Sequence, residues 1–245
     1  MPWTCYHRLM PRSEIVWAGY YVVRVVEAPS GLRRGALSEQ ILTLSSCITE
    51  FFPDTWALDW VTCSEEDRFD AAAQLGIRGR ALPTFARQMT EAFDASQLGW
   101  PNVWLSLDAA RQAARDFLPP DAGVLVGLGL PLDLVDGVLA AAEPKPGEGR
   151  IGLYSALSQR LPLDPAGEPI GWEILGLERG GTYHSWLCNS LHVHIPPSIG
   201  EAASGAFGTI ASEQHARDIL ATIARDPSIA EPVPWFLGRL FRYSL

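Results

Sequence analysis

Segments rich in β-branched and aromatic residues alternate along this chain with segments whose apolar residues recur at helical spacing. A clear strand-like segment is 14–26 (EIVWAGYYVVRVV), and a clear helical one is 212–225, where Ser212 is the expected N-cap. Alternation of the two types is typical of a sheet covered by helices. The sequence therefore predicts an α/β (or α+β) fold, a single globular domain with a mixed β-sheet flanked by helices.

The boundaries of these elements follow from caps, from Pro and Gly positions and from periodicity. The strands expected in the sheet are 16–25, 56–62, 123–126 and 172–177. The expected helices are 38–52, 65–75, 83–95, 108–117, 131–142, 150–161 and 212–225. The aromatic segment 233–243 fits either a strand or a helix.

One short segment is a candidate boundary between two lobes. Residues 143–149 (EPKPGEG) combine Pro and Gly, which interrupt regular structure. We interpret the segment as a surface loop because it is short. Residues 1–245 are therefore expected to form one domain, with a possible lobe boundary at 143–149.

Charge limits the partners that this chain can take. The 28 acidic and 19 basic residues give a net charge of −9 at pH 7. Such a field repels nucleic acids and attracts a basic protein. The longest apolar stretches are too short or too interrupted to span a bilayer. We therefore expect a protein partner, of basic character, and neither nucleic acid nor membrane.

Cysteine usage and the N-terminal residues indicate the compartment. The four cysteines are scattered without CxxC spacing, and residues 1–12 contain no apolar leader segment. Lys145 is the only lysine among the 19 basic residues, a bias typical of a GC-rich bacterial genome. These features predict a bacterial cytoplasmic protein with reduced thiols.

Reactive side chains are concentrated in residues 183–194 (YHSWLCNSLHVH). His184, Cys188 and His192 are spaced by four residues, which places them on one stripe of a helix or on one face of a strand. An imidazole beside a thiol can produce a thiolate nucleophile. Cys188 with His184 or His192 is therefore the candidate catalytic set of a cysteine-dependent hydrolase or transferase.

Three other interpretations of this segment remain open. Its apolar residues are typical of a buried core, in which cysteine is common. The segment could instead contact a partner or a ligand. His184, Cys188 and His192 could also bind zinc with His194, although one straight strand does not provide tetrahedral convergence. We accordingly expect no metal and no cofactor.

Candidate protein-contact residues lie in the segment 56–70. They are two tryptophans on one face of a predicted strand and an acidic group at the start of a predicted helix: Trp56, Trp60, Glu65, Glu66, Asp67 and Asp70. Tryptophan is enriched at interface hot spots, and acidic groups attract a basic partner. Core packing of the tryptophans and capping of the helix by the acids explain the same pattern.

The sequence thus favours a non-catalytic, immunity-type protein that binds and neutralises a toxin or another basic partner. This hypothesis rests on the acidity, on the nine tryptophans, and on the absence of GxGxxG, Walker, HExxH and GxSxG motifs. The alternative is the cysteine-dependent hydrolase or transferase.

Overall fold

The computed structural model describes residues 14–27, 40–49, 51–52, 81–119, 123–188 and 205–245. The strands are β1 (Ile15–Val23), β2 (Val26–Glu27), β3 (Gln40–Ile41), β4 (Phe51–Phe52), β5 (Leu98–Gly99), β6 (Val103–Trp104), β7 (Val124–Pro131), β8 (Glu168–Leu177), β9 (Tyr183–Ser185) and β10 (Trp235–Tyr243). The α-helices are α3 (Ala81–Asp94), α4 (Leu107–Phe117), α5 (Leu132–Ala142), α6 (Gly152–Ser158) and α9 (Glu213–Arg225).

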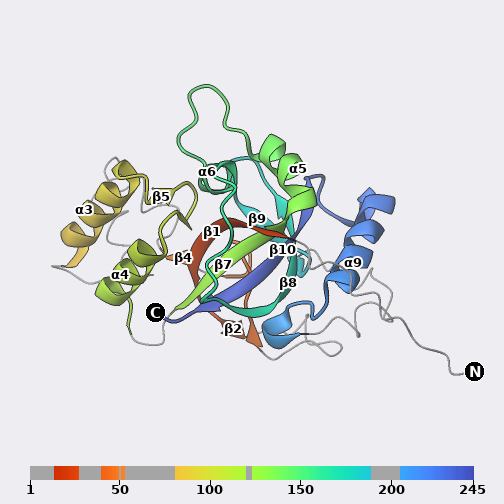
Figure 1. Cartoon of the computed structure of the whole chain (residues 1–245), viewed down its shortest axis with the longest axis horizontal. Coiled ribbons are helices and arrows are strands. Elements are labelled where there is room, and N and C mark those ends of the chain that lie inside the picture. Colours follow the sequence, from red (N-terminus) through yellow and green to blue (C-terminus); the bar gives the residue numbers. More distant parts are fainter. Residues whose placement is uncertain (1–13, 28–39, 50, 53–80, 120–122, 189–204) are drawn as a thin grey trace, which may run out of the picture.

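An eight-stranded sheet forms the centre of the part that is described (Figure 1). Its strand order is β5-β6-β1-β7-β10-β8-β9, and β4 pairs with β1 outside this path. The long strands β1, β7, β10 and β8 make up the middle of the sheet. The short strands β2 and β3 pair with each other in a separate small sheet.

The predicted combination of a sheet with flanking helices is confirmed, but the strand directions differ from the mixed sheet that we expected. Every ladder between the named strands is antiparallel, and parallel pairing occurs among the described residues only as a single bridge between Trp100 and Ile151. The helices α5 and α6 connect β7 to β8, a crossover typical of parallel neighbours. The last strand, β10, lies between these two and runs antiparallel to both.

Helices cover both faces of the sheet. Because adjacent strand residues point to opposite faces, neighbouring residues of one strand pack against different helices. Tyr20 of β1 packs in an apolar cluster with Phe85 of α3 and with α4. Its neighbour Tyr21 belongs to the cluster that contains α5 and α6. Helix α9 packs through Ile219 against β8 and β10. No helix in the described part of the chain combines the length and the apolar character needed to cross a membrane.

Most of the predicted elements are present. The predicted strands at 16–25, 123–126 and 172–177 overlap β1, β7 and β8, whereas the predicted strand 56–62 and the predicted helix 65–75 lie outside the described residues. Ser212 caps α9 as expected, since its hydroxyl accepts a hydrogen bond from the backbone N–H of His215 at 3.2 Å. The ambiguous segment 233–243 contains the strand β10.

The predicted helix at 38–52 is wrong. Its described part consists of β3 and β4 with a turn at residues 46–48 between them. The backbone N–H of Ser45 donates to the hydroxyl of Thr43 at 3.1 Å, a local bond that competes with helix formation. The backbone N–H of Leu42 donates to the carbonyl of Phe207 at 3.0 Å. Partners elsewhere in the chain thus replace the hydrogen bonds of a helix.

We expect the protein to unfold in a single cooperative transition. Strands from before and after the candidate boundary 143–149 alternate in one sheet, because β10 pairs with both β7 and β8. Neither side can therefore lose its structure without exposing strand edges of the other. Differential scanning calorimetry should give equal calorimetric and van't Hoff enthalpies. Two resolved transitions that map to the two sides would show that 143–149 is a linker between domains.

Candidate functional site

The β8–β9 hairpin brings an imidazole and a carboxylate together. A tight turn joins the two strands, and in it Gly180 and Gly181 have φ values of 94° and 91°, which glycine adopts at little cost. His184 Nε2 lies 2.6 Å from Glu178 Oε1 across this turn. The hydroxyl of Thr182 donates to Glu178 Oε2 at 3.2 Å. Both carboxylate oxygens are thus engaged, and the carboxylate holds the imidazole ring in one orientation.

The turn between β3 and β4 places a thiol beside this hairpin. The carbonyl of Ser45 accepts a hydrogen bond from the backbone N–H of Thr49 at 3.0 Å, which closes a helical turn. The hydroxyl of Thr49 donates to the carbonyl of Arg24 at 2.8 Å and ties the turn to the end of β1. Cys47 lies on this turn with an exposed side chain, and its Sγ is 3.9 Å from His184 Nδ1.

These side chains form a series in which the imidazole stands between the thiol and the carboxylate. Because a carboxylate accepts hydrogen bonds, Nε2 of His184 is the nitrogen that donates to Glu178, and in a neutral imidazole the other nitrogen, Nδ1, is then the acceptor. Nδ1 is the nitrogen that faces Cys47. Contacts of this kind are often longer in the absence of substrate than in its complex. The series contains a nucleophile, a base and a group that orients the base.

Cys188 lies in the same cluster, but its environment is different. Its thiol accepts a hydrogen bond from the backbone N–H of Ser185 at 3.3 Å and lies 3.0 Å from Ser45 Oγ. The residue is buried, and this burial raises the pKa of the Cys188 thiol, so that the neutral form is favoured. Of the two cysteines in the cluster, Cys47 is therefore the accessible one.

A buried carboxyl group supports the cluster from the interior. The hydroxyl of Thr43 donates to Oε1 of Glu173, and the backbone N–H of Leu44 donates to Oε2 at 3.1 Å. Burial raises the pKa of Glu173 to about 7, although these hydrogen bonds act in the opposite direction. Thr43 also accepts from the N–H of Ser45, whose hydroxyl contacts Cys188. A hydrogen-bonded chain thus extends from Glu173 to the Cys188 thiol.

The structure brings together two of the three catalytic candidates predicted from the sequence. His184 and Cys188 lie in this cluster, whereas His192 lies outside the described residues. The predicted protein-contact residues also lie outside them: Trp56, Trp60, Glu65, Glu66, Asp67 and Asp70. Binding of a basic protein through these residues therefore stays a prediction.

The sequence analysis did not identify Cys47 and Glu178. Cys47 is 137 residues from His184 and lies in a segment that was expected to be helical, so spacing alone does not connect the two. Glu178 had a local signal, because a Gly-Gly turn between two strands brings the residues on its two sides together.

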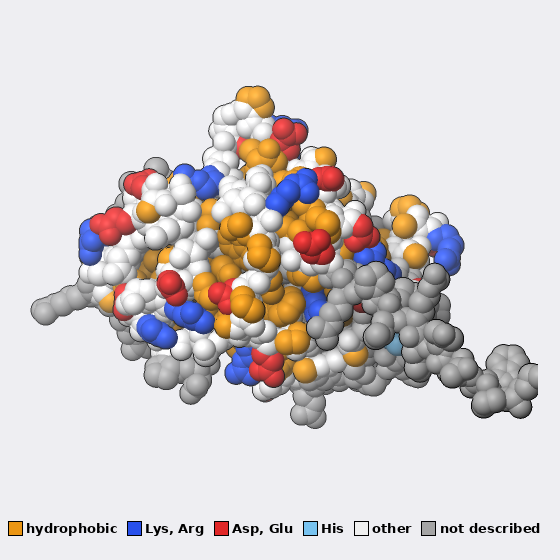
Figure 2. All heavy atoms as spheres, in the orientation of Figure 1, with side chains coloured by type: hydrophobic (Ala, Val, Ile, Leu, Met, Phe, Trp, Pro, Cys, Tyr) orange, Lys and Arg blue, Asp and Glu red, His pale blue; other side chains and the backbone are white. Residues whose placement is uncertain are grey.

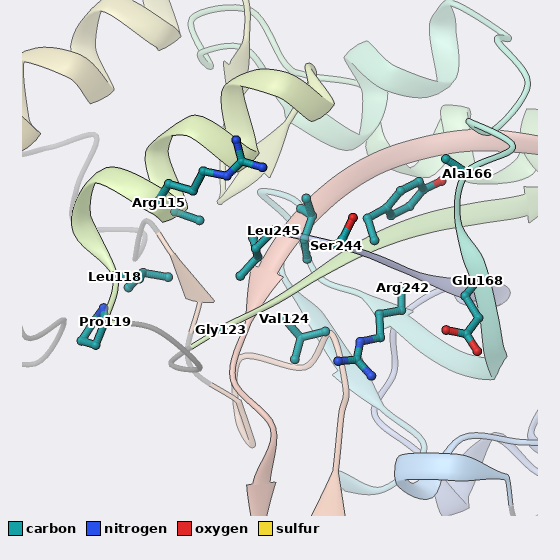
Figure 3. A pocket seen from close by; sticks show the side chains of 13 residues that line it. Arg115, Leu118, Pro119, Gly123, Val124, Ala166, Glu168, Arg242, Ser244 and Leu245 are labelled. Atoms are coloured by element: carbon teal, nitrogen blue, oxygen red, sulfur yellow. The ribbon is translucent and has the colours of Figure 1, made fainter.

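The described surface also contains a cavity of about 790 Å³ that is not part of this cluster. Figure 3 shows Arg115 of α4 on one side of it, and Arg242 and Glu168 on another. Arg242 of β10 is the cross-strand partner of Glu168, at the start of β8. Glu178 follows the other end of that strand, and ten residues of extended chain cover roughly 33 Å. The cavity and the cluster are therefore separate.

Charges on the face shown in Figure 2 do not form a block of one sign. Acidic and basic side chains are interspersed around a central area of hydrophobic side chains. Among the described residues, opposite charges also form ion pairs, for example Arg87 with Glu91 and Arg217 with Asp133. On the coloured part of this face, acidic and basic side chains are therefore mixed rather than segregated.

Comparison with known proteins yields no match. No family model matches the chain, and neither does any curated protein or any solved structure. The site is therefore interpreted from its geometry.

Proposed function

We propose that this protein is a thiol-dependent acyltransferase or hydrolase in which Cys47 is the nucleophile and His184 the base, with Glu178 orienting the imidazole. The observation that supports this proposal is the position of His184, with Nδ1 3.9 Å from Cys47 Sγ and Nε2 2.6 Å from Glu178. We propose Cys47 rather than Cys188, the candidate nucleophile from the sequence, because Cys188 is buried and Cys47 is exposed.

The reaction divides into two steps. In the first, His184 Nδ1 takes the thiol proton, Cys47 Sγ bonds to the acyl carbon of an ester, thioester or amide, and the leaving group departs with the proton held by His184. In the second, water attacks the thioester and gives a proton to Nδ1. The carboxylic acid then leaves, and that proton returns to the Cys47 thiolate. Another nucleophile in place of water makes the reaction an acyl transfer.

The surroundings of Cys47 suit a small or flexible acyl group that reaches the thiol from solvent. The Cys47 side chain lies on a turn and is exposed, and Ser46 beside it is also exposed. The turn itself is held firmly, since the backbone N–H of Cys47 donates to Ser45 Oγ at 3.3 Å. Holding the nucleophile and the base in fixed positions lowers the entropic cost of reaching the transition state.

We expect the reduced protein to release close to one equivalent of p-nitrophenolate per chain in a burst with p-nitrophenyl acetate, and to carry the acetyl group on Cys47. Cys47→Ala should abolish the burst. His184→Ala should slow it by about 10²–10⁴-fold, the range for loss of a general base. Stopped-flow absorbance gives the rate, and peptide mapping by mass spectrometry locates the acetyl group.

The matched control is Ser46→Ala, which changes the neighbouring exposed residue of the same turn and removes none of the reacting groups. Its burst should equal that of the wild type. A burst that survives Cys47→Ala, or an acetyl group mapped to another residue, would contradict the proposal. Thermal melting of each variant verifies that it is folded.

A further inference from the structure

We infer that Cys47, His184 and Cys188 together form a Zn²⁺ site, and that the bound ion blocks the thiol chemistry. Two thiolates and an imidazole are ligands that Zn²⁺ binds well. Their ligand atoms all lie within 4.8 Å of one another, and Cys47 Sγ and His184 Nδ1 are 3.9 Å apart. Around a tetrahedral Zn²⁺, with bonds of about 2.3 Å to sulfur and about 2.1 Å to nitrogen, ligand atoms lie roughly 3.5–3.8 Å apart. Only a small inward movement of the side chains is needed.

The three ligands come from separate parts of the fold, and this provides the convergence that one straight strand lacks. Cys47 lies on the turn between β3 and β4, His184 on β9, and Cys188 in the turn that follows β9. These segments meet because the residues before Cys47 are hydrogen-bonded to Glu173 of β8, the strand that pairs with β9. The set needs neither His192 nor His194.

The hydrogen bonds around the ligands are those that a zinc site uses. Glu178 accepts from Nε2 of His184, which leaves Nδ1 for the ion and matches the carboxylate–histidine–zinc pattern. The backbone N–H of Ser185 donates to Cys188 Sγ, and the hydroxyl of Ser45 lies 3.0 Å from it. Donors of this kind stabilise a thiolate in a buried position.

The three ligands that the described residues provide leave the fourth position of a tetrahedral ion for a further ligand such as water, and the exposed Cys47 makes the ion accessible from solvent. A thiolate and an imidazole bound to the ion are no longer a nucleophile and a base. This inhibitory consequence rests on the proposed function, whereas the metal binding itself does not.

The binding is tested by titrating the reduced, metal-free protein with Co²⁺ and then displacing it with Zn²⁺. We expect one equivalent per chain, with the near-ultraviolet absorption of a thiolate–cobalt bond. Cys47→Ser and Cys188→Ser should each lose stoichiometric binding, and Glu178→Gln should weaken it by about 10–100-fold, as loss of an outer hydrogen bond does. Cys47 and Glu178 have exposed side chains, so these two variants keep the test valid if Cys188→Ser fails to fold.

Ser46→Ala is again the control, and its affinity should equal that of the wild type. The absence of stoichiometric binding would overturn the inference, as would an affinity that Cys47→Ser leaves unchanged. Zinc should suppress the p-nitrophenyl acetate burst of the wild type, and a chelator should restore it. A burst that zinc-saturated protein retains would overturn the inhibitory part.

The two proposals fail in different ways. If zinc binding depends on Cys47 but the metal-free protein shows no burst, the proposed reaction is contradicted and the metal site is supported. If the burst depends on Cys47 but the protein binds no zinc, the metal site is contradicted and the proposed reaction is supported.

Discussion

Replacing Gly19 with alanine should lower the free energy of unfolding by roughly 2–5 kcal/mol. Gly19 lies in β1 where the ladder with β7 changes register, and its φ is 119°, a conformation that costs other residues roughly 1–2 kcal/mol. A Cβ at this position would overlap the buried side chain of Val103 and lie 3.5 Å from the ring of Tyr21. Overpacking of this kind costs a further 1–3 kcal/mol or so.

Urea denaturation of the purified variant provides the measurement, and Gly137→Ala is its matched control. Gly137 lies inside α5, and a Cβ added there meets nothing within 4 Å. The same substitution should therefore stabilise the protein by about 0.5–1 kcal/mol, because alanine favours the helix. If Gly19→Ala leaves the midpoint unchanged or raises it, the close contact between Gly19 and Val103 is not a feature of the folded protein.

Between pH 4.5 and 7.5, the wild type should lose about 3 kcal/mol of unfolding free energy relative to Glu173→Gln. The folded-state pKa of Glu173 is raised to about 7 by burial, against 4.5 for an ordinary glutamate. The folded protein therefore holds a proton that the unfolded chain has already released in this interval, so stability falls as pH rises. Each pKa unit corresponds to about 1.4 kcal/mol. The stability that the protonated Glu173 contributes is complete below pH 4.5, falls as the pH rises toward 7, and is lost above pH 7.

The comparison uses the difference between the two proteins at each pH, so that groups common to both cancel. The glutamine does not titrate, and any unpaired N–H that it introduces adds an offset that is independent of pH. Chemical denaturation at several pH values gives the two curves. Curves that run parallel across this interval would mean that Glu173 ionises normally in the folded protein.

The local sequence pattern predicts correctly those helices and strands whose formation depends on neighbouring residues. The β-branched and aromatic residues of β1 and the capping serine of α9 predict a strand and a helix with nearly correct boundaries. Residues 40–52 behave differently, since their backbone partners include Glu173 and Phe207, which are far away in the sequence. No periodicity in the segment itself encodes those partners.

Some residues of the candidate site could likewise be predicted from local spacing, and others could not. The spacing of His184 and Cys188 placed both in one reactive group, because they belong to one short segment. The choice of thiol depended on burial, which the fold determines and the spacing does not. Cys47 enters the group through long-range hydrogen bonds, among them those that attach residues 43–45 to β8 and to the segment after β9.

The central position of β10 determines the order in which this protein can be completed during synthesis. Leu128 of β7 and Ile174 of β8 are made long before their partners in β10, Leu240 and Leu237. Until residues 235–243 emerge, the facing edges of β7 and β8 present unpaired N–H and C=O groups that can pair with another chain. A polypeptide that is interrupted before Trp235 therefore leaves a gap in the middle of the sheet and should aggregate or be degraded.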